Sequence, residues 1–276
     1  MHNIGLIALD LDGTLLNSRK ELTPVSYAAL ERAANMGIHI IPTTGRFYDA
    51  MPVVIKDLPF VRYVIAVNGA EILDTWTHQV LYRAEIAWQD AIHIMEYLDT
   101  LPVIYDCFMD DQAWMTAEFK EHIDEFAPDE HYRKMLYELR QPVPELKAFL
   151  AERKQDIQKT QFFFRDMDLR ARMLKELPKR FPNHLVSSSV VNNIEINHPD
   201  ANKGNAIHQL CRVLGLDISQ TMSFGDGLND LAMLDAAAIG VVMSNAVDEV
   251  KAHADYITAS CDEDGVAKAI DHFLNL

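Results

Sequence analysis

The sequence has little cysteine and no long hydrophobic run, and each shortage excludes a class of protein. Cys107, Cys211 and Cys261 are the only cysteines among 276 residues. They are odd in number and far apart, so they predict neither a disulfide framework nor a zinc site, and they fit a reducing compartment. No segment approaches the roughly 20 consecutive apolar residues of a membrane-spanning helix. Acidic residues interrupt the N-terminal run too early for a signal peptide. We therefore expect a cytoplasmic protein without a membrane partner.

Basic side chains are also scarce. Lys and Arg total 25 against 41 Asp and Glu, which gives a net charge of −16. This charge repels the phosphate backbone of nucleic acids, so nucleic acid is not an expected partner. Hydrophobic residues make up 49% of the chain. That content is enough to bury a sizeable core, and at this length one core tends to split into two domains.

Both ends of the chain alternate short apolar runs with amphipathic stretches. Residues 4–11 are almost continuously apolar, which is typical of a strand buried on both faces of a parallel sheet. Thr23, Pro24 and Gly37 suit the N-cap, the first turn and the C-terminal end of a helix. Further expected elements are strands at 38–42, 61–67 and 221–224, a hairpin through Ile72 and Leu81, and helices at 203–214, after Gly227 and at 266–274.

This alternation predicts an α/β fold with a doubly wound, mostly parallel sheet. The middle of the chain, residues 86–188, has a different composition, with most of the Lys and Arg and strand candidates at 103–109 and 158–165. We interpret it as an inserted α+β domain. The predicted organisation is a discontinuous core of residues 1–85 and 189–276 with that domain inserted.

The strongest local motif is Asp10-Leu11-Asp12-Gly13-Thr14, at the end of the first expected strand. In open α/β sheets the ligand crevice lies beyond the carboxyl ends of the strands. Two carboxylates placed there are costly to hold without a cation, so Asp10 and Asp12 suggest a divalent metal. An ordinary polar turn is the simpler alternative. A calcium loop of the EF-hand type requires a helix where a strand is expected.

Two weaker motifs suggest phosphate binding. Thr43-Thr44-Gly45-Arg46 follows the second expected strand, where a hydroxyl and a free N–H beside a glycine form a phosphate-binding corner. A plain turn from strand to helix fits this segment equally well. Lys203 begins a helix and would neutralise phosphate oxygens, although a surface lysine is the commoner interpretation.

The fourth motif is GDGLND at residues 225–230, after a short apolar strand. It places Asp226, Asn229 and Asp230 at another strand end. Because the carboxyl ends of parallel strands share one edge of a sheet, these side chains and those of the first motif are expected together. The motif therefore favours a metal site over a solvated loop.

Together and in this order, the four motifs resemble those of the haloacid dehalogenase-like hydrolase superfamily, and specifically its Cof-type sugar-phosphatase group. The resemblance covers both core segments, and residues 68–70 are similar to the N-G-A loop of that group. It implies that the inserted domain is a C2 cap. The matching residues are Asp10 and Asp12 for the D-x-D-G-T pair, Thr44 for the hydroxyl, Lys203 for the lysine, and Asp226 and Asp230 for the G-D-x-x-N-D acids.

The resemblance implies a Mg²⁺-dependent phosphatase that works through an aspartyl-phosphate. Asp10 would be the nucleophile, and Asp12 would be the general acid and then the general base. Mg²⁺ would be held by Asp10, the Asp12 backbone carbonyl and Asp226. Asp230 would orient a metal ligand or a metal-bound water from outside the coordination shell.

The same resemblance implies fixed donors around the transferring phosphoryl group, and a small phosphorylated metabolite, above all a sugar phosphate, as partner. Two alternatives remain. A phosphomutase or phosphotransferase would pass the phosphoryl group to a second hydroxyl. A sensor would bind without turnover, but pure binding does not need both Asp10 and Asp12. The implied donors are the Thr44 hydroxyl, the N–H groups of Leu11 and Gly45, the Lys203 ammonium and the Asn229 amide.

Overall fold

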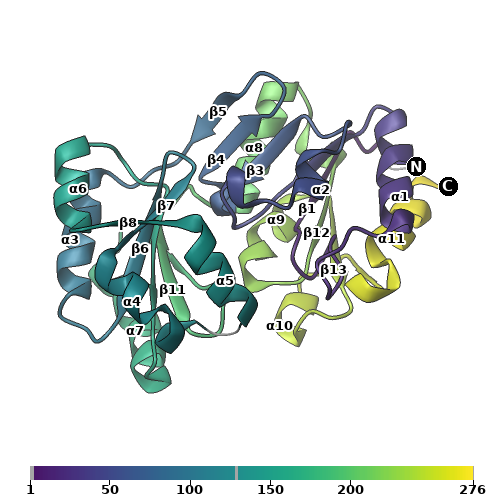
Figure 1. Ribbon diagram of the computed structural model, residues 1–276. Coiled ribbons are helices and arrows are strands. Elements are labelled where there is room, and N and C mark those ends of the chain that lie inside the picture. Colours follow the sequence, from purple (N-terminus) through teal and green to yellow (C-terminus); the bar gives the residue numbers. More distant parts are fainter. Residues whose placement is uncertain (1–2, 128–129, 276) are drawn as a thin grey trace. The chain divides into compact units, whose positions relative to one another are not determined.

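The computed structural model of the chain describes residues 3–127 and 130–275 (Figure 1). The chain forms two compact units. Unit 1 consists of Met1–Arg46, Met51–Arg83 and Asn202–Leu276, and unit 2 consists of Phe47–Ala50 and Ala84–Ala201.

Unit 1 is built on a five-stranded parallel sheet, as the α/β expectation requires. The strand β1 (Leu6–Leu9) is an inner strand, paired with β12 on one side and β2 on the other, and all its residues are buried, as the continuous apolar run predicts. The strand order is β14 (Tyr256–Thr258), β13 (Ile239–Met243), β12 (Thr221–Gly225), β1 and β2 (His39–Pro42).

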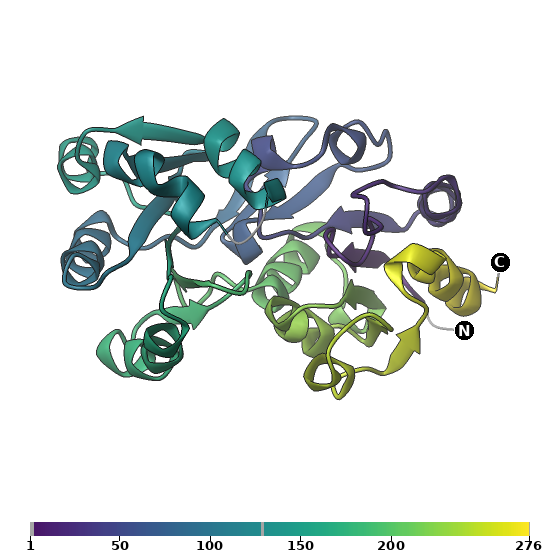
Figure 2. The same cartoon turned by 60° about the horizontal axis from the view of Figure 1, so that its bottom comes forward.

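Long helices flank this sheet. The helix α8 (Lys203–Leu214) packs against Leu6 and Ala8 of β1, and alternation along the strand turns Ile7 and Leu9 to the opposite face. The helices α1 (Pro24–Asn35) and α11 (Gly265–Leu274) lie side by side (Figures 1 and 2). The short elements of unit 1 are α2 (Val53–Lys56), η2 (Val67–Gly69), η3 (Ile218–Gln220), η4 (Leu228–Asp230), α9 (Leu231–Ala236), α10 (Asp248–Lys251) and η5 (Cys261–Glu263).

The expected third strand joins a different sheet. The strand β3 (Tyr63–Ala66) touches the parallel sheet through one bridge, between Thr43 and Ile65. The chain then turns back at the left-handed residues Asn68 and Gly69, so β3 pairs antiparallel with the next strand. The expected hairpin is present as β4 (Glu71–Asp74) and β5 (Gln79–Arg83) in this three-stranded sheet.

Unit 2 contains a six-stranded sheet, antiparallel except between β7 and β8. Its helices are α3 (Trp88–Leu98), α4 (Ala117–Phe126), α5 (Glu130–Leu139), α6 (Leu146–Arg153) and α7 (Met167–Arg180), and η1 (Tyr48–Ala50) also belongs to it. Among the described residues of both units, every helix is too short or too polar to cross a membrane. In order, the strands are β10 (Leu185–Ser187), β11 (Asn193–Asn197), β9 (Lys159–Phe163), β6 (Ile104–Met109), β7 (Gln112–Thr116) and β8 (Arg140–Val143).

Three segments that were expected in the core lie in unit 2 instead: residues 47–50, 84–85 and 189–201. The last of these is the longest. The reason is pairing: β11 lies between β9 and β10 in the sheet of unit 2. Lys159 and Glu195 form a buried ion pair across that sheet at 2.8 Å. Composition alone does not reveal such a long-range partner.

The N-cap of α1 can be tested by mutation. The Thr23 hydroxyl accepts a hydrogen bond from the Ser26 N–H at 3.0 Å and donates one to Asp264. Thr23→Ala removes both contacts, so we expect the free energy of unfolding to fall by about 1 kcal/mol. Urea unfolding followed by circular dichroism measures this change. The exposed Thr77→Ala serves as the control, and equal losses in the two variants would contradict the cap.

Candidate active site

The ends of neighbouring strands bring the predicted acidic residues together in unit 1. Asp10 directly follows β1, and its N–H donates to the Phe224 carbonyl of β12 at 3.0 Å. Asp226 directly follows β12. On the other side of β1, the Thr43 N–H at the end of β2 donates to the Leu9 carbonyl at 2.7 Å. Three parallel strands therefore deliver their following residues to one edge of the sheet.

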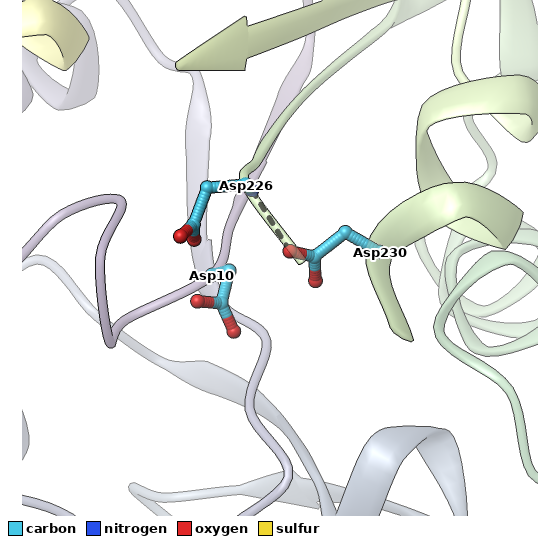
Figure 3. A group of neighbouring side chains, drawn as sticks. All are labelled: Asp10, Asp226 and Asp230. Carbon is cyan, nitrogen blue, oxygen red and sulfur yellow. Dashed lines mark hydrogen bonds between the residues drawn. The ribbon is translucent and has the colours of Figure 1, made fainter. Parts of the chain in front are cut away.

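Asp10, Asp226 and Asp230 form a compact group of carboxylates (Figure 3). One oxygen from each lies within 4.8 Å of the oxygens from the others. The Asp230 carboxylate also organises the backbone, because its Oδ2 accepts from the N–H groups of Asp226 and Gly227 at 3.0 and 2.9 Å. The dashed line in Figure 3 marks the first of these bonds.

Lys203 places a positive charge inside this group. Its Nζ donates to Oδ1 of Asp10 and to Oδ1 of Asp230, each at 2.6 Å, and its side chain is fully buried. The surface-lysine interpretation is therefore wrong. Burial lowers the pKa of Lys203, but the two carboxylates outweigh burial and hold that pKa above its usual value. The ammonium is thus charged at neutral pH.

The balance of charge in the group fits a divalent cation. Three carboxylates and one ammonium leave two negative charges in a buried setting. Burial raises the pKa of Asp10 well above its usual value, against the opposing effect of Lys203. Burial also raises the pKa of Asp226 to about 6, against a hydrogen bond from Thr14. A bound cation would offset this penalty, and carboxylate oxygens are ligands that Mg²⁺ prefers.

The Asp226 carboxylate accepts hydrogen bonds from two side chains and lies against a glycine. The Thr14 hydroxyl donates to its Oδ1 at 2.8 Å. Asn245 Nδ2 donates to its Oδ2 at 3.3 Å and to the Gly13 carbonyl at 2.9 Å. Gly13 has φ +92°, and a Cβ there would lie 2.4 Å from Asp226 Oδ2. Asn245 was not among the expected site residues, although its place after β13 marks it by the same strand-end argument.

The Asp12 side chain has a different, cationic setting. Its two oxygens accept hydrogen bonds from Nε and Nη2 of Arg46, each at 2.9 Å, and Lys20 Nζ is 2.9 Å from Oδ1. Burial raises the pKa of Asp12, but the Arg46 hydrogen bonds and the charges of Arg46 and Lys20 hold it below its usual value. No sequence pattern marks Lys20, which lies in an irregular loop.

The predicted phosphate-binding corner is organised by Asn68. Its N–H donates to the Thr44 carbonyl at 2.9 Å, and its Oδ1 accepts from Asn229 Nδ2 at 3.2 Å. A Cβ on Gly45 would lie 2.9 Å from that Oδ1, so glycine permits the close approach. The Thr44 hydroxyl accepts from the Arg46 N–H at 3.2 Å. These contacts connect Thr44 and Gly45 with Asn229, which is distant from them in the sequence.

Leu11 occupies the turn between the two aspartates. Its side chain is fully buried. Its carbonyl accepts from the N–H groups of Thr14 and Leu16 at 3.4 and 2.8 Å. These bonds fix the backbone that carries Asp10 and Asp12 at the end of β1.

Known proteins that are similar to this chain indicate the chemistry of this group of acidic residues. The family model for haloacid dehalogenase-like hydrolases matches residues 7–270. The chain is 31% identical over 273 residues to 5-amino-6-(5-phospho-D-ribitylamino)uracil phosphatase YcsE of Bacillus subtilis (strain 168), with 99% of this chain and 96% of that protein covered. It is 29% identical over 274 residues to pyridoxal phosphate phosphatase YbhA of Escherichia coli (strain K12), with 96% and 97% covered. The solved structure of the subclass IIB sugar phosphatase BT4131 matches with a TM-score of 0.80 at 25% identity, over 98% of this chain and 99% of that one.

The raised pKa of Asp226 predicts how the stability of the protein depends on pH and on Mg²⁺. Burial raises that pKa from its ordinary value of 3.8 to about 6. Without metal, the folded state then binds the proton more tightly than the unfolded state. Stability should therefore fall as pH rises from about 4 to about 6. A metal ligand must be deprotonated, so Mg²⁺ should stabilise the protein more at pH 7.5 than at pH 5.

Differential scanning calorimetry in Mg²⁺ and in EDTA measures this difference. The increase in Tm caused by Mg²⁺ should grow between pH 5 and 7.5 in the wild type. Asp226→Asn should remove this growth, whereas Asp248→Asn, at an exposed residue of α10, should keep it. An increase in Tm that does not change with pH would show that Asp226 does not control metal binding.

Proposed function

Since this chain is a phosphatase that belongs to the haloacid dehalogenase-like hydrolase family, we propose that it hydrolyses small phosphorylated metabolites, above all sugar phosphates. The reaction would use Mg²⁺ and an aspartyl-phosphate on Asp10. The observation that carries this proposal is Lys203, which bridges Asp10 and Asp230 beside Asp226. The names of similar proteins, which include a sugar phosphatase, support a small substrate.

Asp10 is the proposed nucleophile. Its contact with Lys203 fixes the orientation of the carboxylate at the end of β1. A carboxylate oxygen forms a bond to phosphorus while the bond between phosphorus and the leaving oxygen breaks. Water then attacks the same phosphorus, which releases phosphate and restores Asp10.

Asp10, Asp226 and the Asp12 backbone carbonyl are the residues proposed to hold Mg²⁺. When bound, the ion offsets the negative charge that the carboxylates and the phosphoryl oxygens bring together. Asp230 has the role of a positioning residue in this proposal. Its oxygens accept from the N–H groups of Asp226 and Gly227 and from Lys203, so it orients its neighbours.

Asp12 is proposed to act as general acid and then as general base. The leaving alkoxide of an alkyl phosphate needs a proton, which the Asp12 carboxyl would give. The ionised carboxylate that results can take a proton from the attacking water. Arg46 and Lys20 favour this ionised form in the structure, and it is the form that the second step needs.

The donors proposed for the phosphoryl oxygens are those of the corner around Asn68 and the buried lysine. Fixed donors of this kind stabilise the charge of the transition state without reorganising during the reaction. They are the Thr44 hydroxyl, the N–H groups of Leu11 and Gly45, the Lys203 ammonium and the Asn229 amide.

The same proposal assigns roles to the two units. Unit 1 carries all the residues named above and would be the catalytic core. Unit 2 would be the cap domain inserted into that core. The antiparallel sheet of unit 2, with helices packed against it, supports this assignment by its α+β architecture.

The nucleophile is tested with Asp10→Asn. Wild type should release phosphate from p-nitrophenyl phosphate in Mg²⁺ and not in EDTA, whereas the variant should lose more than about a thousandfold in kcat, because it lacks the anionic nucleophile. Asp248→Asn is the matched control and should keep its activity. Beryllium fluoride, which mimics the bound phosphoryl group, should inhibit the wild type tightly. An active wild type without this inhibition, together with an active Asp10→Asn, would show that water attacks the substrate directly.

The acid/base role is tested with Asp12→Asn. This variant keeps the backbone carbonyl but has no proton to transfer. Loss of kcat should reach about a hundredfold or more for a hexose phosphate, whose alkoxide needs a proton. The loss should be smaller for p-nitrophenyl phosphate, whose leaving group departs unaided. Equal losses on both substrates would point to damage at the metal site instead.

A further inference from the structure

The chain passes from unit 1 into unit 2 and back within a short segment. This segment begins directly after Arg46, whose side chain is hydrogen-bonded to Asp12. Unit 1 extends to Arg46, the segment Phe47–Ala50 belongs to unit 2, and Met51 is again in unit 1. Arg46 and Phe47 share one peptide bond, whose planarity leaves only two soft torsions per residue. The position of the segment Phe47–Ala50 therefore constrains the backbone of Arg46, because only these torsions separate the two.

Asp111 anchors this segment within unit 2. The N–H groups of Tyr48 and Asp49 donate to Oδ1 and Oδ2 of Asp111 at 2.6 and 3.1 Å. The Phe47 ring, which is 2% exposed, meets the Phe108 ring edge-on with centroids 5.4 Å apart. Hydrogen bonds to a charged acceptor are stronger than neutral ones. The carboxylate of one residue therefore fixes two consecutive backbone donors.

Arg46 is fixed by contacts of its side chain and its backbone with residues of unit 1. Its Nε and Nη2 reach the two oxygens of Asp12 at 2.9 Å each, and this bidentate geometry sets both the distance and the plane of the carboxylate. Its backbone carbonyl accepts from the Val67 N–H at 3.0 Å. Its position, together with that of Lys20, therefore sets where the Asp12 carboxylate points.

We infer that Asp111 is a positioning residue for the proposed general acid/base, because it anchors the segment Phe47–Ala50, which sets Arg46 and through it the carboxylate of Asp12. This inference rests on the proposed function of Asp12. It describes one route of contacts from Asp111 to the Asp12 carboxylate. The route runs through the backbone at Arg46 and Phe47.

A purely structural role for Asp111 makes a different prediction. If the residue only stabilised the turn Tyr48–Ala50, its loss would reduce the rate of every substrate alike. If it positions Asp12, the loss is confined to substrates whose leaving group needs a proton. The ratio of rates on an alkyl phosphate and on an activated aryl phosphate therefore separates the two roles.

The experiment compares Asp111→Gly with Asp110→Gly in the full-length enzyme. Both residues have φ 55° in the turn between β6 and β7, so glycine fits either position without strain and each change removes one negative charge. The Asp110 carboxylate faces Arg153 at 3.9 Å and serves as the matched control. Asp111→Gly should lower kcat on a hexose phosphate at least about tenfold more than kcat on p-nitrophenyl phosphate. Asp110→Gly should leave the ratio of the two rates unchanged.

A double-mutant cycle with Arg46→Lys tests the route. Lysine cannot make the bidentate contact with Asp12, so this variant alone should lower the same ratio. Adding Asp111→Gly to it should then have little further effect, because both changes act on one chain of contacts. Additive effects, or the same ratio in Asp111→Gly and Asp110→Gly, would overturn the inference.

The outcome for Asp12→Asn separates this inference from the proposed function. If Asp12→Asn loses activity equally on both substrates, the acid/base role fails and the inference fails with it. If Asp12→Asn shows the selective loss and Asp111→Gly does not, only the inference is wrong.

Discussion

The contact of the buried Lys203 ammonium with Asp10 and Asp230 is the interaction on which the acidic site depends. Without it, three carboxylates at adjacent strand ends would share a buried space with no counter-charge, and their protonated forms would be favoured. Removing one partner of a buried ion pair leaves an uncompensated charge, which is costly. Because Asp10 and Lys203 are 193 positions apart in the sequence, this contact also requires the two ends of the chain to fold together.

The four aspartates of the site differ in their partners more than in their positions. Asp226 receives a hydroxyl and an amide, which leave its pKa raised to about 6 by burial. Asp12 receives two cations, which hold its pKa below the usual value. Asp230 receives two backbone N–H groups and the Lys203 ammonium, so its oxygens are engaged in positioning. The surroundings of an aspartate therefore decide which role its carboxylate can take.

The sequence predicts the features that depend on local pattern. The N-cap of α1 at Thr23 and the left-handed Gly37 after its last turn are where the residue types place them, and the strand-end rule brings the candidate acids Asp10, Asp226 and Asp230 to one edge. What could not be predicted depends on distant partners. An apolar run does not state which strand it pairs with, so β3 was expected in the parallel sheet. Residues 189–201 were expected in the core because no local pattern shows that Glu195 of β11 pairs with Lys159 of β9.

The chain passes between the two units at positions that are next to residues of the site in the sequence. One crossing follows Arg46, which contacts Asp12, and another precedes Asn202, the N-cap of the helix that Lys203 begins. Gly69, with φ +97°, packs against the same crossing, since a Cβ there would lie 2.4 Å from the Asn202 carbonyl. Unit 2 is thus joined to unit 1 beside the residues that hold Asp10 and Asp12. Substitutions at these crossings are therefore expected to alter the chemistry as well as the connection between the units.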